Sequence, residues 1–240
     1  MRWIVTLALA SLFGGAATVS AQVPDACTQG NDWPARIQAC TTAIDGGGLA
    51  AADQAVAYDA RCRARIGLQQ FEQAIGDCDQ AIALNPELAS AYNNRGAAHG
   101  NLGNHQQAVA DFDAMVRLEP NNANAVNNRA VAQNQAAWAL YVGGDAAGGL
   151  PLVDQALAVA PNAANFLDTR GHINAALGNA DAALADFEAA MRAGGAQFTR
   201  QYQQALANYG YDPGPVDGAY GNRTRTALTE CLQAGCRLLE

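Results

Sequence analysis

The chain has 240 residues, a formal net charge of −8, 14 arginines and no lysine, and half of its residues are hydrophobic. An acidic surface repels nucleic acid and anionic membrane surfaces, so we expect neither as a partner. Alanine supplies most of the hydrophobic residues, which favours helices that pack closely through small side chains. The length suits one extended domain and one small module.

Residues 1–21 have the features of a secretory signal peptide. Arg2 precedes an apolar run, and Val19, Ser20 and Ala21 place small residues at the cleavage spacing. An uncleaved membrane anchor is the alternative, but the run is short and interrupted by glycines. We therefore predict a periplasmic protein of a Gram-negative bacterium, with no membrane insertion after cleavage.

All six cysteines follow this segment, and an even number behind an export signal is typical of disulfides. Neighbours in the sequence pair as Cys27–Cys40, Cys62–Cys78 and Cys231–Cys236. A metal site is the competing interpretation, but it requires clustered Cys-x-x-Cys or Cys/His spacing, which the sequence lacks. We expect three disulfides, no metal and no cofactor.

Residues 22–48 contain one predicted helix, in which Trp33, Ile37, Cys40 and Ile44 recur at helical spacing. This segment has the pattern of the second half of a two-helix unit. A half-unit at the end of a stacked array is expected, because the terminal unit must cap the core.

A repeat of 34 residues follows, because similar helix ends close at Pro86 and Pro120. The next closure, at Pro161, comes seven residues late, and the last falls on Gly195. Seven residues are two helical turns, so we predict a long first helix in the third unit, over 124–141. The predicted units are 55–88, 89–122, 123–163 and 164–195.

The second helix of the third unit is preceded by four glycines and contains Pro151 near its start. Glycines weaken a helix, and proline fits a first helical turn. We therefore predict that this helix begins near residue 150.

Small residues stand where the two helices of a unit would cross, at Gly96 and Ala108 and again at Gly171 and Ala183. Together with the period, the two-helix pattern and the closing proline, they make residues 31–195 resemble tetratricopeptide repeats. The resemblance implies an all-α fold, in which four helix-pair units and an N-terminal half-unit form a right-handed superhelix over residues 22–195. The concave groove of this family commonly holds an extended peptide or a partner helix.

The first unit departs from the family pattern. Cys62 replaces the small residue of its first helix, and Cys78 replaces the aromatic residue of its second. Two thiols at an antiparallel crossing favour a bridge within one hairpin, worth about 2–4 kcal/mol. The alternative is a pair of reduced, buried cysteines that pack as small hydrophobic residues.

The spacing points a set of side chains from the first helices into the groove. Asparagine amides in Asn-Asn-Arg motifs resemble those that contact ligand backbone in peptide-clamping members, and an amide both donates and accepts. The alternative is that they only solvate the groove and cap helices. A carboxylate clamp is disfavoured, because lysine is absent. The candidate peptide-binding residues are Arg63, Asn93, Asn94, Asn127, Asn128, Asn134 and His172, together with Asp59, Ser90, Val131 and Asp168.

The three histidines, His99, His105 and His172, have no nucleophile or carboxylate pair at a catalytic spacing. GxSxG, HExxH and phosphate-cradling glycine loops are also absent from the sequence. We therefore expect packed or solvated histidines, no catalytic residues and no enzymatic activity.

Composition changes after Gly195, where tyrosines, prolines and turn-forming glycines concentrate. The sequence predicts helices over 198–209 and 222–232, joined by a tight loop. The order GY-x-PGPVDG-x-YG-x-x-T in residues 210–224 resembles the small three-helix peptidoglycan-binding-like domain, and we assign it to 196–240. About 40 residues are marginal for independent folding, so we expect the module to share core with the repeats.

The resemblance implies contact with wall glycopeptide through the loop and the start of the last helix. Tyrosines would pack on sugar faces and arginine would pair with stem-peptide carboxylates. The alternative is that Tyr211 and Tyr220 form the core of the module itself. The candidate peptidoglycan-binding residues are Tyr211, Asp217, Tyr220, Asn222, Arg223 and Thr224.

The combination of export signal, repeats and wall-type module predicts a non-enzymatic adaptor. Its repeats would bind a protein or peptide partner, and its module would bind peptidoglycan. The alternative is an accessory subunit of a wall-remodelling enzyme or secretion system, in which the module contacts protein instead of glycan.

Overall fold

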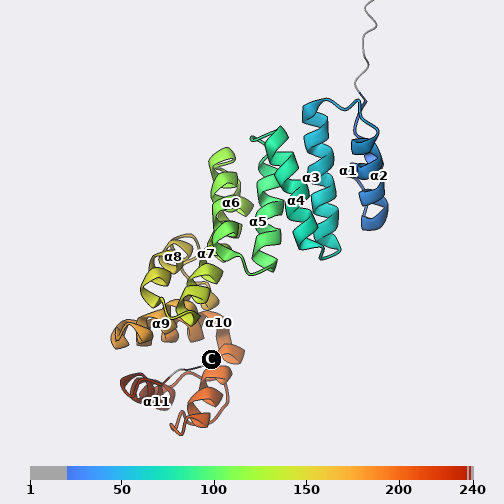
Figure 1. Cartoon of the computed structure of the whole chain (residues 1–240). Helices are drawn as coiled ribbons and strands as arrows, with labels where there is room; N and C mark the ends of the chain where they lie inside the picture. Colours follow the sequence, from blue (N-terminus) through green and yellow to red (C-terminus); the bar gives the residue numbers. More distant parts are fainter. Residues whose placement is uncertain (1–20, 237, 239–240) are drawn as a thin grey trace, which may run out of the picture.

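The computed structural model describes residues 21–236 and 238, and most of these residues are helical. The predicted signal peptide, apart from Ala21, lies outside them. The helices follow one another along an elongated body, with the N-terminal helices at one end and α11 at the other (Figure 1). None of the helices in the described part is both long and apolar enough to span a membrane.

Four antiparallel helix pairs follow an N-terminal half-unit, as predicted. The half-unit consists of the short helix α1 (Asp25–Thr28) and α2 (Trp33–Asp45). The pairs are α3 (Ala51–Gly67) with α4 (Phe71–Leu84), α5 (Ala89–Asn101) with α6 (His105–Leu118), α7 (Ala123–Val142) with α8 (Ala146–Val159), and α9 (Ala164–Ala176) with the first part of α10 (Ala180–Asn208). Each first helix also packs against the preceding unit, so the pairs stack into one core.

The long helix predicted in the third unit is present, because α7 has 20 residues where α5 has 13. The predicted start of α8 near residue 150 is wrong, since the helix begins at Ala146. The Asp145 carboxylate caps it by accepting a hydrogen bond from the Gly148 N–H at 2.9 Å. Pro151 therefore lies inside the helix.

Gly149 explains why glycines stand in this helix. It is buried at the crossing of α7 and α8, where an added Cβ would lie 2.8 Å from the carbonyl oxygen of Ala137. The glycine that seemed to weaken the helix is required for its close approach to α7.

Arginine–aspartate pairs join the two helices of three units, a feature that the sequence reasoning missed. The pairs are Arg61–Asp77 at 2.7 Å, Arg95–Asp111 at 2.6 Å and Arg170–Asp186 at 2.7 Å. Each aspartate is 3–5% exposed, so its charge is compensated within the protein. In all three units the aspartate lies 16 residues after the arginine, a regularity that the sequence contains.

The C-terminal module continues directly from the last repeat. Helix α10 kinks at Gly195, where φ is 70°, and then runs to Asn208. α11 (Asn222–Gln233) packs against it, so the described part of the module has two helices where the resemblance implied three. One hydrophobic cluster joins the fourth unit to the module, with Phe187 and Met191 against Tyr202, Leu206 and Leu228. The first helix of the module thus covers the end of the repeat stack.

Candidate functional site

The concave side of α3, α5 and α7 carries a row of five polar side chains and one valine, which we call the amide groove (Asp59, Asn93, Asn94, Asn127, Asn128 and Val131). Side chains of neighbouring units interact along it. Asp59 accepts hydrogen bonds from the Ser90 hydroxyl and the Asn94 amide, each at 2.8 Å. The Asn128 amide donates to Asn93 Oδ1 at 2.9 Å. These bonds order the side chains of the groove before any ligand arrives.

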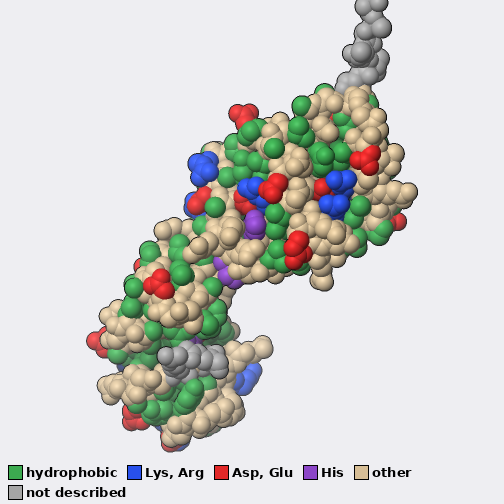
Figure 2. Space-filling model, in the orientation of Figure 1, with side chains coloured by type: hydrophobic (Ala, Val, Ile, Leu, Met, Phe, Trp, Pro, Cys, Tyr) green, Lys and Arg blue, Asp and Glu red, His purple; other side chains and the backbone are tan. Residues whose placement is uncertain are grey.

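Charge is concentrated at the N-terminal end of the amide groove. Burial raises the pKa of Asp59, although its hydrogen bonds and the nearby Arg63 act in the opposite direction. Arg63 is exposed. Arg36, which sequence reasoning missed, is buried beneath this end and donates to the carbonyl oxygens of Cys27 at 3.0 Å and Gly30 at 3.3 Å. Figure 2 shows basic and acidic side chains interspersed over the N-terminal units.

A hollow of about 250 Å³ opens between α5 and α7 beside the Asn93–Asn128 bond. It exists because Gly96 and Gly100 have no side chains; an added Cβ on Gly96 would lie 3.1 Å from the Phe112 ring. Val131 contributes an apolar wall and is 45% exposed. The residues that form it include Gly96, Gly100, Phe112, Asn128, Val131 and Gln135. Sequence reasoning placed Val131 in the groove but did not identify the hollow.

Two predicted groove residues do not lie on an open surface. His172 is 2% exposed, and its Nε2 lies at hydrogen-bond distance from the Leu238 carbonyl oxygen. Asn134 is 9% exposed, and its Oδ1 has no partner among the described residues. Both lie on first helices of their units, and Leu238 lies against His172.

The predicted wall-binding residues divide into buried and exposed members. Thr224 is 1% exposed and donates to the Pro213 carbonyl at 2.9 Å. Tyr220 donates to Glu188 Oε1 at 2.7 Å, and Tyr211 packs against the same hydrophobic cluster. Burial, followed by the Glu188 carboxylate, raises the pKa of Tyr220. The two tyrosines are partly buried against the core of the module, and part of each side chain stays exposed.

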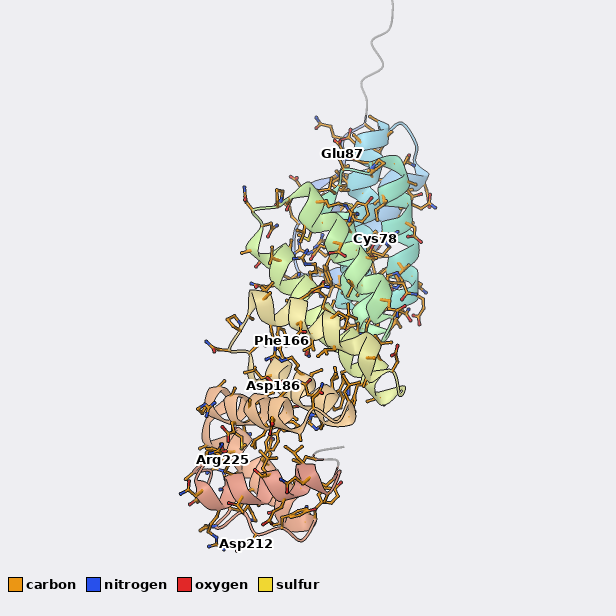
Figure 3. The ribbon with its side chains drawn as sticks, turned by 90° about the vertical axis from the view of Figure 1, so that its left-hand side faces the viewer. Cys78, Glu87, Phe166, Asp186, Asp212 and Arg225 are labelled. Carbon is orange, nitrogen blue, oxygen red and sulfur yellow. A yellow bond between two sulfur atoms is a disulfide. The ribbon has the colours of Figure 1, made fainter. Side chains whose placement is uncertain are left out.

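The exposed members surround the loop. Asp217 accepts from the Ala219 N–H at 2.8 Å and from the Gln203 amide at 3.2 Å, and the backbone bond chiefly lowers the pKa of Asp217. Arg223 pairs with Asp212, which lies at the end of the module remote from the repeats (Figure 3). Asn222 is exposed beside Arg223. A polar tip thus remains accessible beside the partly buried tyrosines.

The structure places the three predicted cysteine pairs in disulfides. The Cα–Cα distances are 4.7 Å for Cys27–Cys40, 5.6 Å for Cys62–Cys78 and 5.2 Å for Cys231–Cys236. Cys62 and Cys78 are fully buried where α3 and α4 cross. Among residues 21–236 and 238, no three His, Cys, Asp or Glu side chains gather as metal ligands.

Comparisons with known families match both regions of the chain. Residues 89–122 match the family described as "Tetratricopeptide repeat", and residues 64–103 match "TPR repeat". Residues 196–231 match "Putative peptidoglycan binding domain". The chain therefore contains tetratricopeptide repeats followed by a peptidoglycan-binding-like domain, as the sequence motifs predicted. No curated protein matches the chain in sequence.

Similar solved structures are repeat proteins of low sequence identity. A crystal structure of MamA is 15% identical, has a TM-score of 0.53, and the match covers 68% of this chain and 89% of MamA. YrrB, described as "a TPR protein with an unusual peptide-binding site", is 19% identical, with a TM-score of 0.49 and 82% and 94% coverage. The second TPR domain of human RPAP3, whose structure includes an HSP70 peptide, is 32% identical with a TM-score of 0.39. The match covers 42% of this chain and 81% of that domain. The likeness to MamA supports the fold.

Proposed function

We propose that the protein is an exported, non-enzymatic adaptor that holds a segment of a partner protein in the amide groove and contacts peptidoglycan through its C-terminal module. The observation that carries the first half is the hollow between α5 and α7 beside the ordered amides Asn93 and Asn128. The signal-peptide pattern and the module's family match support the second half.

An extended peptide is the class of ligand that this surface fits. Its backbone alternates N–H and C=O groups, and asparagine side chains offer the complementary acceptor and donor. The hollow takes one apolar side chain, with the Phe112 ring and Val131 as apolar contacts. Since the side chains around the hollow are uncharged, an uncharged segment with one aliphatic residue fits best.

A displayed library of random dodecapeptides tests the groove. We expect the mature protein to enrich peptides that share one aliphatic position, and Val131→Asp to weaken the best peptide by at least about tenfold. Leu118→Asp is the matched control, because Leu118 is an aliphatic residue that is 38% exposed at the end of α6 and lies outside the hollow. Absence of enrichment, or equal losses in both variants, would show that the groove is not the binding site.

Co-sedimentation with purified sacculi tests the wall contact. The Asn222→Ala/Arg223→Ala double variant changes only exposed side chains, so it should fold normally and lose sedimentation at moderate salt. Tyr209→Ala is the control, because Tyr209 is 51% exposed and is outside the predicted surface. Sedimentation that is absent in the wild type, or unchanged in the double variant, would remove the wall-binding half.

A second function is favoured by the partial burial of Tyr211 and Tyr220, since their packing against the hydrophobic cluster reduces the aromatic surface that sugars could contact. In this proposal the module is the docking surface of an accessory subunit of a wall-remodelling enzyme or secretion system. A photo-crosslinking residue at position 222 distinguishes the two in intact cells. A discrete protein adduct supports docking, whereas crosslinking to wall material alone supports glycan contact.

A further inference from the structure

A second and larger pocket, of about 960 Å³, lies where the repeats meet the C-terminal module. It is formed by the last turns of α7, the first turn of α8, the concave side of α9 and the chain that follows α11. We call this pocket the tail pocket. Its aromatic wall consists of Trp138, Tyr141, His172 and Phe187. Neither the amide groove nor the predicted wall-binding surface includes Trp138, Tyr141 or Phe187.

The tail pocket is a continuation of the concave groove. His172 occupies, in the fourth unit, the position that Val131 occupies in the third and Arg63 in the first. Trp138 stands one repeat length, 34 residues, before His172, and their rings meet edge to face at a centroid distance of 5.4 Å. The two extra turns of α7 thus supply a second groove position that faces the last unit.

The chain's own C-terminal tail occupies this position. Leu238 is 2% exposed and packs in the cluster that contains Phe187 and Tyr202. Its carbonyl oxygen lies at hydrogen-bond distance from His172 Nε2, while His172 Nδ1 lies 2.9 Å from the Asp168 carbonyl oxygen. Asp168 accepts a hydrogen bond from the Tyr202 hydroxyl, which fixes the helix that carries His172 against the module.

A disulfide holds the tail in place. Cys236 is bonded to Cys231, which is fully buried in α11, so Leu238 follows a short closed ring by two residues. The ring limits the conformations of the tail and lowers the entropy lost when Leu238 docks. A flexible tail of this length would otherwise pay that cost in full.

We propose that the tail pocket is a second peptide-binding site, which Leu238 occupies as an internal ligand. The site takes a segment that buries one aliphatic side chain beside Phe187 and presents that residue's carbonyl oxygen to His172. A partner peptide of the same pattern binds only when the tail has left. The inference goes beyond the proposed function, because it concerns different residues and requires neither export nor wall contact.

The test uses the tail as a separate peptide. The protein is truncated after Cys236, which keeps all three disulfides, and the probe is a fluorescent peptide of residues 234–240 with Cys236→Ser. We expect saturable binding to the truncated chain and at least about tenfold weaker binding to the full chain, because the internal tail competes. The same peptide carrying Leu238→Asp should not bind. Equal binding to both chains, or none to a folded truncated chain, would overturn the proposal.

Carboxypeptidase digestion of the full chain decides the matter if the truncated chain does not fold. Mass spectrometry follows the release of Leu238 from the wild type and from His172→Ala, with His99→Ala as the control. We expect His172→Ala to speed release at least about tenfold, because the docked fraction of the tail falls. Equal rates in the three proteins would contradict an internal ligand. Neither assay depends on the amide groove, so a failure here is distinguishable from a failure of the proposed function.

Discussion

The second and third units follow the same sequence plan but hold their helices together differently. In the second unit, Arg95 lies between Asp111 of its own unit at 2.6 Å and Asp79 of the preceding unit at 2.6 Å. The hydrogen bond to Asp111 chiefly raises the pKa of Arg95. In the third unit, the Arg129 side chain forms an ion pair with Asp113 of the preceding unit at 3.3 Å, and its Nε has no partner within residues 21–236 and 238.

The seven-residue insertion explains the difference. The first half of α7 keeps the spacing of the preceding unit, so Asn128 and Arg129 meet Asn93 and Asp113. The second half of α7 instead keeps the spacing with α8. At an offset of 41 residues, Ala136 corresponds to Arg95 and Leu152 corresponds to Asp111. Alanine and leucine thus stand at the positions of the ion pair. The insertion allows one helix to complete the amide groove and begin the tail pocket.

The largest expected effect follows from removing one member of the buried pair. Asp111→Ala leaves Arg95 with only the half-exposed Asp79, and we expect a loss of roughly 3 kcal/mol in the free energy of unfolding. Chemical denaturation followed by circular dichroism measures it. Asp113→Ala is the control, because its pair with Arg129 is exposed and worth about 0.5 kcal/mol. Equal losses of unfolding free energy in the two variants would show that the Arg95–Asp111 and Arg129–Asp113 pairs stabilise the protein equally.

The close crossing of the third unit gives the next effect. Gly149→Ala places a Cβ 2.8 Å from the Ala137 carbonyl oxygen, so the helices must separate, at a cost of about 2 kcal/mol. The matching change in the second unit, Ala108→Gly, adds no clash and should cost about 1 kcal/mol through helix propensity. Thermal unfolding ranks the two. A larger loss for Ala108→Gly would mean that Gly149 is not at the tight contact.

These two sites also show how far the sequence could lead. Repeat length, helix pairs, the long α7 and the half-unit follow from hydrophobic period and closing prolines, because these features repeat. The ion pairs also recur, with the aspartate 16 residues after the arginine in each of three units. This spacing can be interpreted as an ion pair only when the crossing of the two helices is known. The predicted start of α8 is wrong because the prediction considered only the low helix propensity of glycine. Gly149 is required in the helix, since a side chain there would meet the Ala137 carbonyl oxygen.

For the candidate sites, the sequence identified side chains but not their surroundings. Asn93, Asn128 and Val131 were placed in the groove, yet the hollow beside them depends on two glycines and the Phe112 ring. His172 was placed there too, but only the folded chain brings Leu238, 66 residues away, onto its ring. Long-range contacts of this kind leave no local pattern in one sequence.

A smaller effect is expected when the second unit is given the pattern of the third. The double variant Arg95→Ala/Asp111→Leu replaces the ion pair with the apolar pair found at Ala136 and Leu152. Because both charges leave together, unfolding should change by no more than about 1 kcal/mol, well below the loss for Asp111→Ala alone. A double variant as unstable as the single one would show that the ion pair has no apolar equivalent at this crossing.

The smallest effect concerns Asp59, which stands where the second and third units have Asn93 and Asn127. Burial raises the pKa of Asp59 in the folded protein, so the folded state binds its proton more tightly than the unfolded chain. This contribution to stability is present below the unfolded pKa and is lost as the pH rises through the folded pKa. Asp59→Asn keeps the acceptor for Asn94, and its NH2 group can donate to the Ser90 hydroxyl in place of the second bond. The variant lacks the charge, so its stability relative to the wild type should increase with pH across that window. Urea unfolding at a series of pH values measures the difference, with Asp181→Asn as control because Asp181 is exposed. A stability difference that does not change with pH would mean that the pKa of Asp59 is the same in the folded and unfolded protein. Asp59 would then be as well solvated as an ordinary surface carboxylate.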